Sequence, residues 1–274
     1  FGTIMSKGLN PLAKGMSFNL KGAYSYDWNN DNSEMSAAAA NGMLISNHSY
    51  GIVSGWDQNS DSADRWEFNG KYDEKEDFKF GLYNQTAQTY DSISYNAPYY
   101  LIVKSAGNNR SNTGPAVGQP YWRRDENGKL YNAGNRPDSL SSNNSFDILP
   151  TDANAKNILT VGAIAPISAG YLKPLDASIT SFSSWGPTDD GRIKPDLVAP
   201  SGNNTSNAAP VVSGSVLLVQ EVYLDQASNS EFMKASTVKE KIELTVDLPA
   251  KAIKSLEKIY QIDFALEISK HGSG

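Results

Sequence analysis

Two segments near the middle of the chain decide the fold, SFSSWGPTDDGRIKPDLVAP (residues 181–200) and NTSNAAP (204–210). From Ala208 through Val219 the residues are nearly all small or apolar, which predicts a helix buried on every side. Ser206 lies at the N-terminus of this helix, where backbone N–H groups and the helix dipole favour negative charge. The residues alone leave two interpretations open, a helix-capping serine or a nucleophile.

The two segments resemble the signature that leads into the active-site serine of subtilases, the subtilisin-like serine proteases. NTSNAAP is similar to the family's Gly-Thr-Ser-Met-Ala-Ala-Pro, and the resemblance implies that Ser206 is the nucleophile. The stretch VKSAGNN (103–109) resembles the strand end that delivers the oxyanion-hole asparagine, which would be Asn108. In a subtilisin, losing this donor costs about 2.7–4 kcal/mol. Taken alone, an asparagine after a glycine is most often a left-handed turn residue.

A third match, SNHSYG (46–51), resembles the strand that pairs with an extended substrate in this family. The resemblance implies two walls of a specificity pocket. One wall also offers main-chain partners to the peptide by β-augmentation, and it consists of Ser49, Tyr50 and Gly51. The opposite wall consists of Ser105, Ala106 and Gly107. The alternative for residues 46–51 is a plain strand end that turns on the glycine.

Three unbroken apolar runs, 43–47, 99–103 and 158–164, predict strands that are covered on both faces. A capping box at 31–34 predicts the start of a helix that Asn41-Gly42 ends. Together with the resemblance, which covers roughly residues 1–240, these patterns predict an α/β fold. We expect a mostly parallel sheet flanked by helices in three layers, with polar surface loops and small inserted elements between the strands.

The tail from 241 to 274 changes character and predicts a small β-α-β appendage. Ile242, Leu244, Val246 and Leu248 alternate with polar residues, as in a half-buried strand, and a helical stripe and a second alternating run follow. The closing Gly-Ser-Gly resembles an engineered linker. We therefore expect an incomplete subtilase-like catalytic domain over 1–240 and a tail over 241–274 that need not be native.

A subtilase needs a histidine base and a carboxylate that orients it. In the family the histidine comes just before the segment that residues 1–4 match, and the carboxylate lies further upstream, so both would precede residue 1. His48 lies in the substrate-strand match, where we expect a packed or hydrogen-bonded structural side chain, and His271 lies in the tail. A circular permutant, in which Asp247 and His271 supply the missing groups, is the alternative to solvated tail residues.

The segment around Ser206 also departs from the family pattern. Asn204 stands where the family has a glycine, and Asn207 stands where it has an apolar residue. Only residues 201–205 separate Pro200 from Ser206, a shorter excursion than is usual in the family. We expect these departures to affect the geometry of the nucleophile.

Composition limits the partners. The net charge of −6 and the scattered basic residues argue against nucleic acid and against an anionic membrane. Without cysteine, disulfides and thiolate metal sites are excluded. No cofactor is certain, but Asp27, Asn29 and Asp31 have the spacing of the first EF-hand ligands and could coordinate calcium weakly. The alternative is a solvated turn and helix cap, because the twelfth position is Ala38 rather than Glu.

Three functions follow from these observations. The first is a secreted, periplasmic or cell-surface serine endopeptidase that acts on an extended peptide or protein. As an isolated chain it should be weak or inactive, because loss of the base in subtilisin costs about 10⁶ in turnover and leaves about 10³–10⁴ over water. The second is a non-catalytic peptide-binding pseudoprotease, and the third is an engineered or truncated scaffold.

Overall fold

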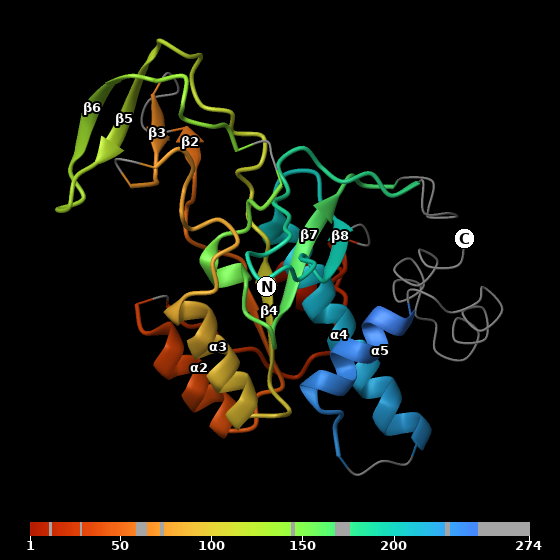
Figure 1. Ribbon diagram of the computed structural model, residues 1–274. Coiled ribbons are helices and arrows are strands. Elements are labelled where there is room, and N and C mark those ends of the chain that lie inside the picture. Colours follow the sequence, from red (N-terminus) through yellow and green to blue (C-terminus); the bar gives the residue numbers. More distant parts are fainter. Residues whose placement is uncertain are drawn as a thin grey trace.

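The computed structural model describes residues 1–10, 13–27, 29–58, 65–71, 74–143, 146–167, 176–227 and 231–245. Its centre is a four-stranded sheet in the order β1-β4-β7-β8, with every neighbouring pair parallel (Figure 1). The strands are β1 (Ile45–His48), β4 (Leu101–Ser105), β7 (Leu159–Ile164) and β8 (Leu197–Pro200). The three predicted strands are confirmed, and the signature segment 181–200 ends in the fourth.

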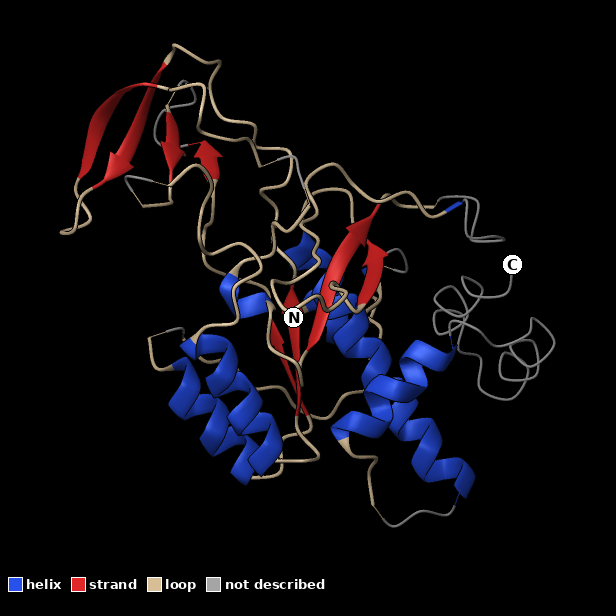
Figure 2. Ribbon diagram, in the orientation of Figure 1, coloured by secondary structure: helices blue, strands red, loops and turns tan. Residues whose placement is uncertain are grey.

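Helices cover both faces of the parallel sheet (Figure 2), which confirms the predicted α/β class. On one face, α2 (Asp31–Ala40) and α3 (Gln85–Asn96) pack against Ile102 of β4. On the other, α4 (Thr205–Ala227) and α5 (Ala235–Thr245) pack against Leu101 and Val103, and the short α1 (Gly2–Met5) contacts α4. Burying each large apolar side chain stabilises the fold by about 1.5–3 kcal/mol, and their alternation along β4 explains the three layers.

The start of α2 differs from the predicted capping box. The N-cap residue is Asn30, which makes no side-chain capping bond, and Asp31 is the first helical residue. The Oδ2 atom of Asp31 accepts a hydrogen bond from the hydroxyl of Tyr50. The predicted end of the helix is confirmed, because Gly42 has a positive φ of 82°.

A second sheet is built from the two polar stretches that follow β1 and β4. Its order is β2-β3-β5-β6, formed by β2 (Trp56–Gln58), β3 (Trp66–Phe68), β5 (Pro120–Arg124) and β6 (Leu130–Asn135). It projects from the parallel sheet (Figure 1) around its own cluster of Trp56, Phe68, Tyr121 and Leu140. The sequence predicted small elements here but not their pairing, in which β3 and β5 join the two stretches.

The strand predicted from residue 242 onwards is wrong where the structure describes it, because Ile242 and Leu244 belong to helix α5. Val238 and Ile242, one helical turn apart, are both buried in the cluster that contains the α4 side chains. Packing against α4 thus outweighs the alternating pattern. The remainder of the predicted appendage, 246–274, lies outside the described residues, and the boundary at 240 stays a prediction. None of the described helices is long and apolar enough to cross a membrane.

Candidate active site

Ser206 is the second residue of α4 and is partly exposed at the N-terminal end of the helix. Asn204 precedes the helix, and its Oδ1 accepts a hydrogen bond from the backbone N–H of Asn207 at 2.9 Å, as an N-cap residue does. Asn204 does not adopt a positive φ, and the side chain of Asn207 is exposed. Both departures from the family pattern therefore fit a regular helix start, contrary to the expected disturbance.

Asn108 is placed against the same helix end. The chain leaves β4 through Gly107, whose φ is 104°, and the Oδ1 atom of Asn108 accepts hydrogen bonds from Thr205. The donors are the Thr205 backbone N–H at 2.7 Å and its hydroxyl at 2.9 Å. Neither the Asn108 side-chain NH₂ nor the Ser206 hydroxyl has a hydrogen-bond partner among the described residues. The structure thus brings Asn108 to the residue that directly precedes Ser206, with both functional groups unengaged.

The first predicted substrate wall, Ser49, Tyr50 and Gly51, follows β1 and is bonded to the serine-bearing helix. The Ser49 hydroxyl donates to the carbonyl oxygen of Ser206 at 2.8 Å. It also accepts from the side-chain amide of Asn47 at 2.8 Å, which in turn accepts from the hydroxyl of Ser213 at 3.0 Å. This chain of hydrogen bonds fixes the end of β1 relative to α4.

The opposite wall, Ser105, Ala106 and Gly107, follows the neighbouring strand β4. The Ser105 hydroxyl donates to the His48 carbonyl at 3.3 Å, and the Gly107 N–H donates to the Thr205 hydroxyl at 3.1 Å. Because β1 and β4 are parallel neighbours, their carboxyl ends meet at one edge of the sheet. The predicted nucleophile, oxyanion donor and both walls therefore gather at that edge.

The side chain of His48 lies on the face of β1 opposite to that of Asn47, which bonds α4, because successive strand side chains point to opposite faces. The single hydroxyl proton of Tyr50 goes to Asp31 at 2.5 Å, so Tyr50 accepts from Nδ1–H of His48, also at 2.5 Å. Nε2 then accepts from the Ser46 hydroxyl at 2.7 Å. Burial, and secondly the charge of Lys104, lower the pKa of His48 to about 3. His48 is a neutral, fully bonded structural side chain, as predicted.

A buried ion pair behind Tyr50 was missed by the sequence analysis. Lys104, in β4, forms a salt bridge of 2.9 Å from its Nζ to Oδ2 of Asp152, and it also donates to the Tyr50 carbonyl. Asp152 belongs to the short helix η2 (Thr151–Ala153). The available signal was a lysine directly after the apolar run 99–103, because a strand covered on both faces buries any charge that it carries.

Comparison with known proteins found that the model of the subtilase family matches residues 2–260. The chain belongs to the subtilase family. It is 36% identical over 90 residues to the C5a peptidase of Streptococcus pyogenes serotype M3, in strains ATCC BAA-595 / MGAS315 and SSI-1. That match spans 27% of this chain and only 7% of the C5a peptidase.

Solved structures similar to this subtilase include two peptide-maturation proteases. The Prenylagaramide maturation protease PagA is 13% identical, with a TM-score of 0.38, over 83% of this chain and 59% of that one. The Patellamide maturation protease PatG is 13% identical, with a TM-score of 0.40, over 97% of this chain and 65% of that one. The chain thus spans less than two thirds of the length of each of these relatives.

Within the described part of this subtilase, Ser206 has no histidine beside it. His48 is separated from it by the strand β1, and His271 lies outside the described residues. The described residues also contain no group of three His, Cys, Asp or Glu side chains that could hold a metal ion. In the predicted calcium loop, Asp27 accepts from the Asn29 N–H and Asp31 accepts from Tyr50. Calcium binding stays a prediction.

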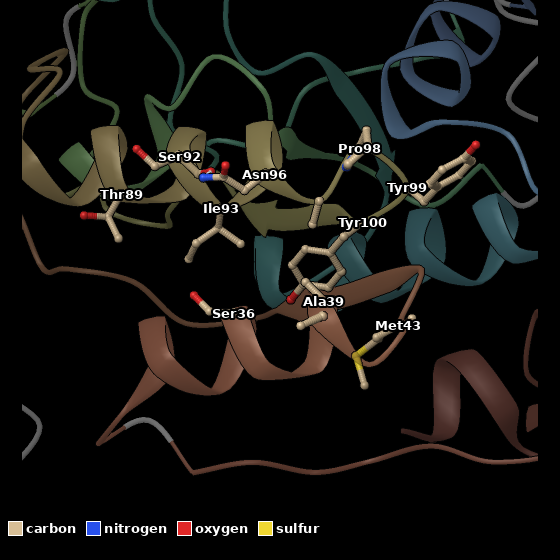
Figure 3. A pocket seen from close by; sticks show the side chains of 13 residues that line it. Ser36, Ala39, Met43, Thr89, Ser92, Ile93, Asn96, Pro98, Tyr99 and Tyr100 are labelled. Carbon is tan, nitrogen blue, oxygen red and sulfur yellow. Dashed lines mark hydrogen bonds between the residues drawn. The ribbon is translucent and has the colours of Figure 1, made fainter.

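A hollow of about 700 Å³ lies between α2 and α3, at the amino ends of β1 and β4. Figure 3 shows Ser36 and Ala39 of α2 facing Thr89, Ser92 and Ile93 of α3 across it. None of its lining residues is a predicted site residue. Because the predicted site is at the carboxyl ends of the same strands, the hollow and the site lie at opposite ends of the sheet.

The depressed pKa of His48 predicts an acid-sensitive fold. Folded His48 stays neutral down to about pH 3, whereas in the unfolded chain it binds a proton below about pH 6.5. Stability should therefore fall as the pH drops from 6.5 towards 3, by roughly 4–5 kcal/mol from this group. Urea unfolding of the wild type and of His48→Asn across this range measures the difference. In a His271→Asn control, the free energy of unfolding should depend on pH as in the wild type. If His48→Asn also kept the wild-type pH dependence, the lowered pKa of His48 would be contradicted.

Proposed function

We propose that this subtilase acts as a serine endopeptidase, with Ser206 as the nucleophile and Asn108 as the oxyanion donor. The single observation that carries the proposal is the pair of hydrogen bonds from Thr205 to Oδ1 of Asn108. Because Oδ1 is held by Thr205, the NH₂ group of the same amide, which has no partner among the described residues, would donate to the reacting oxygen at Ser206. A carbonyl that the serine attacks would develop its negative charge against this donor and the N-terminus of α4.

The substrate in this proposal is an extended peptide or an unfolded segment of a protein. The main chain of residues 49–51 would pair with it as an added strand, because this segment leaves an edge strand of the sheet. The hydrogen bond from the Ser49 hydroxyl to the Ser206 carbonyl would hold this segment so that the scissile bond lies over the serine. The chain is rich in Gly, Asn, Ser and Tyr, which suits a loop-rich secreted α/β protein, so the location in this proposal is secreted, periplasmic or at the cell surface.

A second function, a non-catalytic peptide-binding pseudoprotease, is favoured by one observation. No histidine lies beside Ser206 among the described residues, and the described histidine, His48, is bonded at both ring nitrogens. A site with a binding strand and an oxyanion donor but no base retains peptide recognition while losing most of its chemistry.

A fluorophosphonate probe separates the two functions. The Ser206 hydroxyl would attack phosphorus, fluoride would leave, and the hydroxyl proton would pass to solvent. We expect slow but saturable labelling, mapped by mass spectrometry to Ser206, together with slow cleavage of fluorescein-labelled casein, an unfolded protein. Binding of labelled casein without labelling of Ser206 would instead support the pseudoprotease. Absence of both binding and labelling would reject both functions.

A further inference from the structure

We propose that Lys104 is a positioning residue, which holds the substrate strand from behind so that residues 49–51 present their main chain to the peptide. The inference rests on the proposed function, because it concerns how the same strand is held. The polar partners of Lys104 are the Tyr50 carbonyl and Asp152, so it acts through Tyr50, the middle residue of the segment 49–51.

The burial of Lys104 demands an explanation. The side chains of Lys104 and Asp152 are 0% and 5% exposed, and the distance from Nζ to Oδ2 is 2.9 Å. Desolvating two charges costs several kcal/mol per ion by general estimates, and such a pair is often no more stable than apolar residues of equal volume. Stability alone is therefore a weak reason for a lysine at this position, whereas the geometry that it imposes is a strong one.

That geometry fixes Tyr50 at both ends. Lys104 donates to the Tyr50 carbonyl, and its Nζ lies 4.7 Å from the centre of the Tyr50 ring. At the other end, the Tyr50 hydroxyl bonds His48 and Asp31. With the carbonyl of residue 50 turned inward, the main-chain groups of Ser49 and Gly51 are left for an incoming strand, because adjacent peptide groups alternate in direction.

Asp152 extends this support to both walls of the predicted pocket. A Cβ atom on Gly51 would lie only 3.1 Å from Oδ2 of Asp152, so the carboxylate packs directly against the backbone of the first wall. The adjacent Ala153 packs in one cluster with Ala106 of the opposite wall. The other carboxylate oxygen, Oδ1, is buried without a hydrogen-bond partner among the described residues. The pair thus lies where the two predicted walls meet, and among the described residues Lys104 is the only ion-pair partner of Asp152.

The test separates positioning from charge compensation. Lys104→Met leaves Asp152 buried and uncompensated, so it should lower the melting temperature and weaken peptide binding together. The double variant Lys104→Met/Asp152→Asn removes both charges at nearly constant volume and should regain most of the melting temperature. It still lacks the bond to the Tyr50 carbonyl, so its Kd for fluorescein-labelled casein should stay about tenfold above the wild-type value.

Two further measurements sharpen the result. The rate of labelling by a small alkyl fluorophosphonate should stay within about twofold of wild type in the double variant, since this reagent does not pair with the strand. Lys194→Met is the control at a second buried pair, because Lys194 pairs with Asp196, 2% and 7% exposed, before β8 and near the amino end of β7. Asp196 also pairs with Lys239 at 2.7 Å, so this variant should lose less stability than Lys104→Met. Its casein affinity should stay at the wild-type value.

The outcomes are distinct. A double variant that binds casein as tightly as wild type would overturn the positioning role while leaving the proposed function intact. A Lys194→Met variant that loses casein affinity as strongly would also overturn it, by showing that any buried pair has this effect. A wild type that neither binds casein nor reacts with the probe would instead reject the proposed function, and the inference with it.

Discussion

Replacing Ser206 with alanine should abolish fluorophosphonate labelling and casein cleavage completely. Ser206 is partly exposed at the N-terminus of α4, and no described residue makes a hydrogen bond with its hydroxyl. The Ser49 bond goes to the carbonyl of residue 206, not to its side chain, so Ser206→Ala preserves it. We therefore expect an unchanged fold, with a melting temperature close to wild type, and a labelling rate at background.

A matched control for this variant lies on the same helix. The hydroxyl of Ser215 donates to the Val211 carbonyl at 2.8 Å, one turn earlier, and takes no part in the site. Ser215→Ala should therefore label at the wild-type rate. If Ser206→Ala retained labelling, mass spectrometry would identify another nucleophile, and the assignment of residue 206 would be wrong. Peptide mapping after a single turnover is sufficient to decide this.

The second large effect is expected at Asn108, where the change to aspartate is the sharpest test. Aspartate keeps an acceptor for the two Thr205 donors, so the helix end stays anchored. It replaces the NH₂ donor with a second oxygen, which repels a developing oxyanion. Labelling by the fluorophosphonate should fall by about 10²–10³, the loss found when this type of donor is removed from a subtilisin. The measurement is the second-order rate constant of labelling at constant pH.

Asn108→Ala provides the complementary comparison. It removes both the donor and the acceptor, so the Thr205 N–H and hydroxyl lose their partner, and stability should fall by about 1–3 kcal/mol as well as activity. Asn108→Asp should lose activity without that loss of stability. Wild-type labelling in Asn108→Asp, measured on a folded variant, would show that the amide does not donate to the reacting oxygen.

Local patterns in the sequence were sufficient to predict the parallel sheet and the helix that carries Ser206. The apolar runs became strands because each is covered on both faces, and the small residues after Ser206 became α4 because Ala208, Ala209 and Val212 meet the sheet closely. The approach of Asn108 to Thr205 was expected only from family resemblance. No local pattern brings together two residues that are 97 positions apart.

Other features could not be predicted, because they depend on partners that are remote in sequence. Glu67 of β3 pairs with Trp122 of β5, and strands of three residues give too short a pattern to reveal such pairing. Lys104 carried a visible charge, but its partner Asp152 belongs to a different element. At Ile242 the spacing fitted both a strand and a helix, and only the surface of α4 distinguished them.

The parallel pairing of β3 with β5 has a mechanical consequence for the two predicted substrate walls. One polar stretch begins just beyond Gly51 and the other just beyond Asn108, so the pairing links the segments that follow the two predicted walls. The side-chain amide of Asn109 also donates to Asp57 of β2 at 3.0 Å, which links the same two segments a second time. We therefore expect the two predicted walls to move together. A variant that deletes or transplants one of these two segments should therefore include the other, because either alone would leave an unpaired strand edge, which favours aggregation.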